Sequence, residues 1–396
     1  MKIRLEDCIE TTIDNRGRNP KAYFSQEKYP VIDNFLIKNS LHPDMSAVTR
    51  FIDEETFNNF LRGYIHKDMP IMTLVGNGIG NVTLAPSDEC AIIQNTIGFL
   101  VNEKIDQIYL YYYFLSEQER IRKFDRGSGQ PSIRKTDILA MEIDIPDIKT
   151  QKKIAAILRG VDEKIESNNC INDNLQQQAQ AVFSAWLATH APIADEVTLG
   201  SICLKVTDGS HFSPKDEPSA KIPMLSVKDM EEFDFNLTSC KHISAVDYQK
   251  MVANDCVPQV DDILVAKDGS YLKEIFICNE QRELAILSSI AIFRPDTSII
   301  YPEILLAFLK SPRVLQEVRD NYVSGSALPR IVLKDFKKLQ FLLPNLTAQE
   351  EIAPLLAAIR SQIAVNVAEN QRLSQLRDAL LPKLMSGEID VSNIQL

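Results

Sequence analysis

Two loops in the second half of the chain carry the side chains whose types could do chemistry. One spans residues 205–215 and the other spans residues 267–273, and both are rich in Lys, Asp and Ser. Hydroxyl, imidazole and carboxylate groups can hydrogen-bond to the edges of DNA bases, and lysines can pair with phosphates. A solvated turn has a similar composition, and composition alone slightly favours that simpler interpretation. The candidates for DNA contact in this half are Lys205, Asp208, Ser210, His211, Lys215, Lys228, Lys267, Ser270, Tyr271, Lys273 and Arg330.

The first half of the chain offers a similar but less distinct set of polar side chains. They lie near turn signals at residues 15–17 and 77–80, where Asn and Gly are close together. The densest basic cluster, residues 120–135, has acidic residues interleaved with it, which is typical of a solvated helix face. The candidates for DNA contact in this half are Arg16, Arg18, Asn19, Lys21, Asn77, Asn81 and Arg134.

The chain lacks the motifs that catalysis usually requires. It contains no Gly-x-x-x-x-Gly-Lys-Ser/Thr phosphate loop, no His-Glu-x-x-His pair and no Gly-x-Ser-x-Gly nucleophile elbow. The five histidines are scattered, without metal-ligand spacing. The glycine-rich run 76–80 has no obvious helix after it, so it is better interpreted as a β-turn than as a dinucleotide site. The Asn/Asp-Pro-Pro-aromatic tetrapeptide of amino-group methyltransferases is also absent. We therefore expect no catalysis, no metal and no cofactor in this chain alone.

Composition and charge limit the classes of protein that remain. The formal net charge of −11 argues against DNA binding through overall charge, but local patches still attract phosphates because screening acts over about 10 Å. The seven cysteines include no Cys-x-x-Cys pair, which is typical of free thiols in the cytoplasm. The chain shows no secretory signal and no apolar stretch long enough to span a membrane. We predict a cytoplasmic protein without a membrane partner.

Two long helices are predicted to position the loops. Apolar residues recur at alternating steps of four and three over residues 154–186, as in the seam of a coiled coil. The same pattern returns 198 positions later, over residues 352–384. Two matched helices in one chain can bury each other's apolar seams without a second chain. The pattern therefore favours an internal helix pair.

Each seam contains two asparagines, which lower the stability of a coiled coil but fix its register. Antiparallel pairing would place Asn172 opposite Asn366 and Asn168 opposite Asn370. Parallel pairing would instead place Asn168 opposite Asn366, and the sequence does not exclude it. We expect the antiparallel arrangement, because a whole globular segment separates the two helices.

The repeat extends beyond the helices. Residues 71–99 correspond to residues 265–293, and similar pairs of turn signals follow in each half. The predicted fold class is α+β, with two similar mixed α/β domains separated by an antiparallel pair of long coiled-coil helices and related by a pseudo-twofold repeat. The predicted segments are a first mixed domain at 1–146, a first helical spacer at 147–190, a second mixed domain at 191–344 and a second helical spacer at 345–396.

Local signals predict the bounds of several elements. Thr347 with Glu350 is expected to cap the second long helix and Thr150 the first, and Pro354 is expected to kink or delay the second helix. Expected helices cover residues 53–65, 105–124 and 302–323, and expected strands cover residues 222–227, 263–267, 275–278 and 286–293.

Taken together, these stretches resemble the specificity subunits of type I restriction-modification systems, over nearly the whole chain. The resemblance rests on residues 207–212 followed by 222–228, on 325–331, on 343–352 and on 384–389. It implies that each mixed domain is a target-recognition domain that reads one half of a split double-stranded DNA sequence, while the helices set the gap. It also implies that the helices dock two methyltransferase subunits and that a restriction/translocase subunit joins them. S-adenosylmethionine, ATP and Mg would then bind to the partner subunits. The first domain departs from the family pattern, because nothing in it matches residues 207–211.

Two other functions are compatible with parts of this pattern. A non-enzymatic adaptor with two protein-binding heads and a coiled-coil spacer would suit the acidic total charge. It would show no DNA binding, whereas a DNA reader loses affinity steeply as salt rises. A self-contained restriction enzyme is disfavoured by the missing catalytic motifs.

Overall fold

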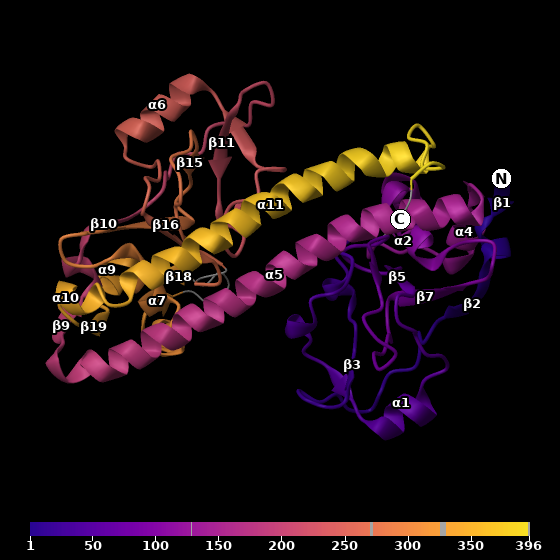
Figure 1. The fold of residues 1–396 in the computed structure, drawn as a ribbon, viewed down its shortest axis with the longest axis horizontal. Helices are drawn as coiled ribbons and strands as arrows, with labels where there is room; N and C mark the ends of the chain where they lie inside the picture. Colours follow the sequence, from indigo (N-terminus) through magenta and orange to yellow (C-terminus); the bar gives the residue numbers. More distant parts are fainter. Residues whose placement is uncertain (128, 270–271, 325–329, 395–396) are drawn as a thin grey trace. The chain divides into compact units, whose positions relative to one another are not determined.

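The computed structural model describes residues 1–127, 129–269, 272–324 and 330–394 (Figure 1). The chain divides into two compact units. Unit 1 contains Met1–Ser167 and Asn370–Leu396, and unit 2 contains Asn168–Glu369. The helices α5 (Ile148–His190) and α11 (Ala353–Met385) each continue from one unit into the other. Each unit therefore includes a part of both long helices.

The centre of unit 1 is a four-stranded antiparallel sheet in the order β2-β7-β5-β6. Strand β5 is buried on both faces, because Met72 packs in the cluster that includes α2 and Ile71 packs in a second cluster on the other side. This explains why all four of its residues are buried rather than every second one, since a strand covered on both faces does not alternate. The elements are β2 (Ile9–Ile13), β5 (Pro70–Thr73), β6 (Val82–Leu84), β7 (Thr96–Val101), α2 (Gln107–Ser116), α3 (Gln118–Arg122) and α4 (Lys135–Leu139).

Unit 2 is built around a sheet with the same strand order, β10-β16-β13-β14. Its strand β13 is also buried on both faces, with Val265 in one cluster and Leu264 in another. The elements are β10 (Cys203–Asp208), β13 (Ile263–Ala266), β14 (Ile275–Ile277), β16 (Ile290–Pro295), α7 (Pro302–Leu309), α8 (Pro312–Asn321), β17 (Val323–Ser324), β18 (Arg330–Ile331), α9 (Leu333–Phe336) and α10 (Leu346–Gln349).

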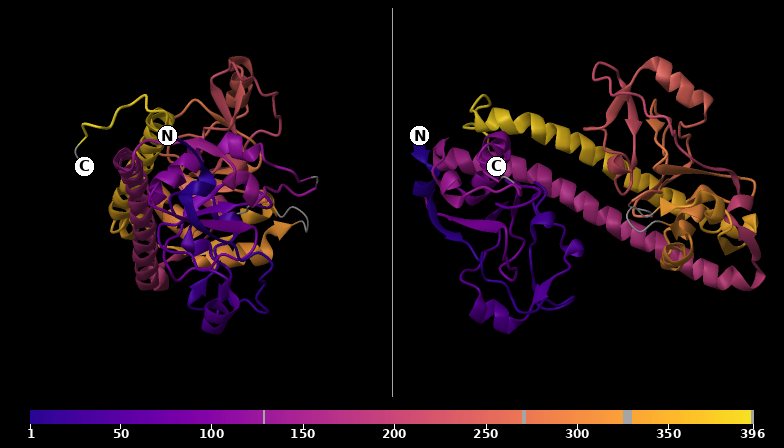
Figure 2. Two further views of the ribbon diagram at one scale, coloured as in Figure 1. Left: turned by 90° about the vertical axis from the view of Figure 1, so that its right-hand side faces the viewer. Right: turned by 180° about the vertical axis from the view of Figure 1, so that it is seen from behind.

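Each central sheet carries a small lobe on the side away from α5, as Figure 1 and the right-hand view of Figure 2 show. A further two-stranded sheet in each unit joins the start of the globular segment to its end, β1 with β8 and β9 with β19. The lobes contain β3 (Tyr29–Pro30), β4 (Phe51–Ile52) and α1 (Glu54–Phe60) in unit 1, and β11 (Ile222–Leu225), β12 (Lys241–Ile243), β15 (Ala285–Ile286) and α6 (Ala245–Ala253) in unit 2. The two-stranded sheets contain β1 (Lys2–Arg4), β8 (Glu142–Asp144), β9 (Asp195–Thr198) and β19 (Gln340–Leu343). Short 3-10 turns are η1 (Leu5–Cys8), η2 (Asn34–Leu36), η3 (Met45–Ala47), η4 (Ala191–Ile193), η5 (Leu199–Ser201) and η6 (Val227–Asp229).

A buried glutamine fixes each helical segment to its own globular part. The side-chain oxygen of Gln151 accepts a hydrogen bond from the backbone N–H of Asp106 at 2.8 Å, and its nitrogen donates to two nearby carbonyls. Gln349 makes the same set of contacts, beginning with the N–H of Tyr301 at 3.1 Å. Both side chains are fully buried, and both are fully satisfied, as buried amides must be. The two units therefore share these buried glutamine hydrogen bonds as well as the strand order of their sheets.

The long helices contact each other in an antiparallel sense within each unit. In unit 2 the side-chain amide of Asn366 donates to Asn172 at 2.8 Å, which is the antiparallel pairing predicted from the sequence. Asn168, also in unit 2, donates to Glu369 at 2.7 Å. In unit 1 the carboxylate of Asp162 accepts from Arg377 at 2.9 Å. In unit 2 the partners of Asn168 and Asn172 run in the opposite direction along α11. In unit 1 Lys153, nine residues before Asp162, contacts Val391, which lies beyond Arg377, so the order is opposite there too.

Several predicted bounds were wrong, each for a local reason. The expected helix at 302–323 is two helices, because Pro312 forces Ser311 into an extended conformation. The expected helix at 105–124 divides at Glu117 into α2 and α3, and the one at 53–65 ends at Phe60. The expected strand at 286–293 is interrupted by a turn between β15 and β16.

The predicted caps of the long helices were also wrong. The carboxylate of Asp147, three residues before Thr150, accepts from the backbone N–H of Lys149 at 2.9 Å and caps the first helix. Asn345 caps α10 by accepting from Ala348 at 3.0 Å, in place of the expected box. The predicted delay from Pro354 is confirmed, because α11 begins only at Ala353.

Among the described helices, none combines the length and apolar composition that crossing a membrane requires.

Candidate nucleic-acid interface

Three segments of unit 2 that are far apart in the sequence meet at the ends of β10, β13 and β18. The ammonium group of Lys267, which follows β13, pairs with the carboxylate of Asp208 at the end of β10, at 2.6 Å. The carbonyl of Lys267 accepts from the backbone N–H of Ile331 at 3.0 Å, and Asp268 forms a β-bridge with Arg330. The structure therefore brings together three of the segments that the sequence analysis selected.

The start of the loop after β10 is held tightly against β15. The N–H of Ser210 donates to the carbonyl of Ile286 at 2.8 Å, and the Ser210 carbonyl accepts from Ser288 at 2.9 Å. A side chain at Gly209 would collide with that same Ile286 carbonyl, so only glycine fits there. The loop beyond Ser210 is thus anchored at one end and projects its next side chains outward.

Some of the predicted residues are used by the fold. Lys267 is 8% exposed and Ser210 is 6% exposed, and Ser210 hydrogen-bonds within its own turn. Lys205 forms an ion pair with Asp255 and donates to its carbonyl at 3.1 Å. These side chains, together with Asp208, hold the loops in place.

The remaining predicted residues of unit 2 face solvent. His211 has a side chain that is 78% exposed and lies 3.4 Å from Asp208, while Lys273 is exposed beside Glu274. The other exposed candidates are Lys215, Lys228 and Arg330. Ser270 and Tyr271, and the motif residues 325–329, lie outside the described residues.

Sequence reasoning missed three side chains beside this loop. Phe212 is 55% exposed, and the ammonium group of Lys250 on α6 lies 5.9 Å from the centre of its ring. Lys241 on β12 donates to the Ser213 hydroxyl at 2.9 Å. No sequence signal could have found the two lysines, because only the fold of the lobe brings β12 and α6 to the loop. Lys250 also pairs with Asp247 at 2.8 Å, so positive and negative side chains alternate around the loop.

Unit 1 has a corresponding junction, with different side chains. Ile133 donates to the carbonyl of Leu74 at 2.8 Å, as Ile331 does to Lys267 in unit 2. Asn15 is buried after β2 and makes four hydrogen bonds, including a pair to Gly63 and Ile92 at 2.9 Å. Such a fully satisfied amide fixes the turn.

The predicted residues of unit 1 divide in the same way. Arg16 pairs with Asp14 at 2.6 Å, and this contact lowers the pKa of the Asp14 carboxyl. Asn81 donates to the carbonyl of Ile37 at 3.0 Å, and the guanidinium of Arg18 lies 5.6 Å from the ring of Phe60. The exposed candidates are Asn19, Lys21, Asn77 and Arg134.

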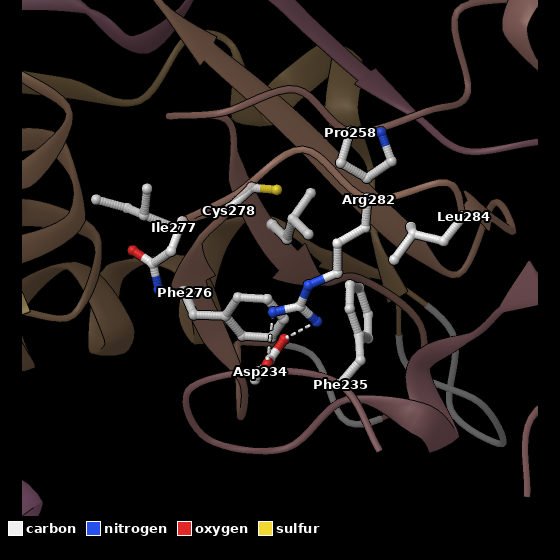
Figure 3. A pocket seen from close by; sticks show the side chains of 10 residues that line it. Asp234, Phe235, Pro258, Phe276, Ile277, Cys278, Arg282 and Leu284 are labelled. Carbon is white, nitrogen blue, oxygen red and sulfur yellow. Dashed lines mark hydrogen bonds and ion pairs between the residues drawn. The ribbon is translucent and has the colours of Figure 1, made fainter. Parts of the chain in front are cut away.

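A small hollow in unit 2 does not qualify as a ligand site. It has a volume of about 10 Å³, which is the space of roughly one water molecule. Figure 3 shows the guanidinium of Arg282 reaching the carboxylate of Asp234 there, with two contacts of 2.7 Å. This pairing raises the pKa of Arg282, although burial alone would lower it. The hollow is therefore closed by an ion pair between two loops.

Within the described ranges, no cluster of three or more His, Cys, Asp or Glu could hold a metal ion.

Comparison with known proteins identifies the family. The sequence matches the family model for the type I restriction modification DNA specificity domain twice, over residues 1–177 and 194–375. The type I restriction enzyme MjaIX specificity subunit of Methanocaldococcus jannaschii is 26% identical over 315 residues, which cover 72% of this chain and 70% of that protein. The HindI specificity subunit of Haemophilus influenzae is 21% identical and covers 97% of this chain and 100% of its own length.

A solved structure supports the same assignment at the level of fold. The S subunit of a type I restriction-modification system from M. genitalium has a TM-score of 0.55 and 17% identity, covering 97% of this chain and 95% of that one. The relatives are specificity subunits, which are distinct from the catalytic components of such systems. This chain belongs to the type I restriction-modification DNA specificity subunits and contains two target-recognition domains.

Proposed function

We propose that each target-recognition domain reads one half of a split double-stranded DNA sequence. The observation that carries this proposal is the identical strand order of the two sheets, each joined to a long helix. Two copies of one module in a single chain suit a target with two separate halves. Joining them in one chain makes the second contact effectively intramolecular, so two weak readers become one specific reader.

We propose further that α5 and α11 form an antiparallel coiled-coil spacer that sets the gap between the half-sites. The contact between Asn172 and Asn366 supports this role, because a buried amide pair fixes the register of two helices. The same helices would dock two methyltransferase subunits, and a restriction/translocase subunit would complete the assembly. S-adenosylmethionine, ATP and Mg would bind to those partners.

The exposed candidates are the residues that we assign to DNA contact. In the second domain the lysines can pair with phosphates, and His211 can hydrogen-bond to a base edge. The buried and half-buried candidates, such as Lys267 and its partner Asp208, position the loops that carry the exposed side chains. The proposed contact residues are His211, Lys215, Lys228, Lys273 and Arg330 in the second domain, and Asn19, Lys21, Asn77 and Arg134 in the first.

Sequencing of methylated adenines tests the proposed function. Cells that carry this chain with its methyltransferase partner are expected to methylate a motif of two short halves separated by a fixed, unspecified gap. Cells with the methyltransferase partner alone serve as the control and are expected to lack that motif. A continuous motif, or no motif, would contradict the proposal.

Removing two exposed lysines tests the assigned contacts. The affinity of a DNA reader falls as salt rises. The double variant Lys215→Ala with Lys228→Ala is expected to make this fall shallower, with the slope of log affinity against log salt reduced in magnitude by about 0.9 for each lost phosphate contact, or about 1.8 in total. Fluorescence anisotropy with DNA of the methylated motif, at several salt concentrations between about 50 and 200 mM, measures this slope. Lys149→Ala with Lys152→Ala, on exposed positions of α5, is the matched control. An unchanged slope in the double variant Lys215→Ala with Lys228→Ala would show that these lysines do not contact DNA phosphates.

A further inference from the structure

Unit 2 contains a cavity of about 80 Å³ between α5, α7, α11 and β14. Every residue that lines it belongs to unit 2. Aliphatic side chains, with Ile275, Leu306 and Ile359 among them, form about half of its lining, and polar or charged side chains form much of the rest. An engineered cavity of about 150 Å³ with similar walls binds benzene. The cavity in unit 2 therefore has room for a group of about three or four carbons.

The corresponding place in unit 1 is filled by three side chains of the protein itself. The hydroxyl of Tyr112 donates to the carboxylate of Asp162 at 2.7 Å, and Arg377 pairs with the same carboxylate at 2.9 Å. Tyr112 is fully buried and Asp162 is 3% exposed. A phenol ring and a guanidinium thus occupy the space between α2, α5 and α11.

The repeat shows why this space is open in unit 2. Positions on α5 and α11 correspond at a distance of 198 residues, so Ala179 stands where unit 1 has its arginine. Helices α2 and α7 align through Asp106 and Tyr301, whose N–H groups bind the two equivalent glutamines. This alignment places Ala307 where unit 1 has its tyrosine. Both alanines line the cavity, since two methyl groups have replaced a ring and a guanidinium.

The third member of the cluster has changed its charge. Arg360 stands where unit 1 has its aspartate, and it lines the cavity. Its guanidinium pairs with Glu303 at 3.0 Å and with Asp261 at 2.9 Å. The charge of Arg360 is therefore already compensated, and the aliphatic walls of the cavity are left without a filling side chain.

The cavity wall carries one hydrogen-bond donor without a partner and one ammonium group. The side-chain nitrogen of Gln180 is inaccessible to solvent and has no hydrogen-bond partner among the described residues. The ammonium group of Lys310 donates to Gln176 at 2.5 Å and lies 5.3 Å from the ring of Phe233. Burial lowers the pKa of Lys310 to about 8, and nearby carboxylates only partly offset this effect. A buried donor without a partner is costly, so an acceptor placed here would be stabilised.

We propose that this cavity binds a small organic molecule with a branched aliphatic group and one oxygen acceptor, either a hydroxyl or a carboxylate. The aliphatic group would fill the space left by Ala179 and Ala307. The oxygen would accept hydrogen bonds from Gln180 and Lys310. We assign a free small molecule to this space, because four elements of one unit line it and leave an opening to solvent through which such a molecule can enter. The proposal is independent of DNA recognition.

Three probes of the same shape test the proposal: isobutanol, isobutyrate and isobutylammonium. The full chain, labelled with ¹³C at its Ile and Leu methyl groups, is titrated with each probe up to 50 mM. We expect saturable shifts at Ile275, Leu306 and Ile359 with the alcohol or the acid, and at least tenfold weaker binding of the amine. The amine offers no acceptor and would meet the positive charge of Lys310.

Matched substitutions test whether the probes bind in this cavity. Ala307→Leu fills the cavity and is expected to abolish the shifts, whereas Ala253→Leu adds the same side chain at an exposed position of α6 and is expected to leave them unchanged. If Ala307→Leu does not fold, Ala179→Leu fills the same space from α5. Shifts spread over the whole chain, equal binding of the amine, or shifts that persist in the filled variant would overturn the proposal. So would the absence of saturable binding by all three probes, or probe displacement by a methyltransferase subunit, which would assign the cavity to a partner's side chain.

Discussion

Replacing Arg377 by Met is expected to destabilise unit 1 by about 3–5 kcal/mol at pH 7.5, since it leaves a buried carboxylate without its cation. The partner carboxylate belongs to Asp162, whose side chain is 4% exposed. Burial already raises the pKa of Asp162, while Arg377 and the Tyr112 hydroxyl hold it down in part. For a unit of this size, such a loss corresponds to a fall in Tm of about 6–20 °C. Differential scanning calorimetry of the full chain measures it.

The pH dependence of this loss distinguishes a buried charge from simple loss of packing. Without Arg377, the pKa of Asp162 in the folded state should rise further above its unfolded value. The folded state then binds more protons than the unfolded state between those two pKa values, so the variant gains stability as pH falls through the folded pKa. We therefore expect the difference from the natural protein to shrink between pH 7.5 and pH 5. A double variant, Arg377→Met with Asp162→Asn, should lack this dependence.

An exposed ion pair provides the control for this prediction. Lys383 and Glu388 lie 3.4 Å apart, and both side chains are more than half exposed. Lys383→Met removes a similar charge near the same end of α11 and is expected to cost at most about 1 kcal/mol. The prediction would be wrong if Arg377→Met lost no more stability than this control, or if its loss of stability did not change with pH. Asp162 and Arg377 would then not form a stabilising buried ion pair.

The sequence predicted the long helices well because their signal is long and regular. A seam that recurs over about 30 residues leaves little ambiguity, and the two asparagines of each seam also predicted that Asn172 would meet Asn366. Short elements were predicted less well, since one residue decides their ends. Pro312 divides the helix after Leu309, and a carboxylate at Asp147 displaces Thr150 as the cap.

The candidate interface was predictable as a set of loops but not as a set of exposed side chains. Lys228 and Lys267 have the same chemistry and both lie beside polar turns, yet Lys228 is exposed and Lys267 is buried. The difference arises because Asp208, 59 residues earlier, lies within 2.6 Å of Lys267. Such pairings depend on the strand order of the sheet, which no local pattern encodes.

Lengthening both helices by whole heptads is expected to lengthen the gap in the recognised DNA. One heptad adds about 10.5 Å at 1.5 Å per residue, which is about three base pairs at 3.4 Å each. Insertions after Ser167 in α5 and after Glu369 in α11 lie where the two units divide. Whole heptads keep the apolar seam in phase. The expected methylome motif therefore keeps both half-sites and gains about three unspecified positions.

The twist of DNA makes this prediction sharper. Three base pairs rotate the second half-site by about 100° around the duplex, because one turn takes about 10.5 base pairs. A one-heptad variant should therefore methylate its lengthened target slowly, since the second domain must follow that rotation. Three heptads add about 31 Å, or about nine base pairs, which is close to a full turn, and should restore much of the methylation. Inserting a heptad in α5 alone is the matched control and should abolish recognition, because the two seams then no longer match. A gap that stayed at its natural length in the one-heptad and three-heptad variants would show that the helices do not set the spacing.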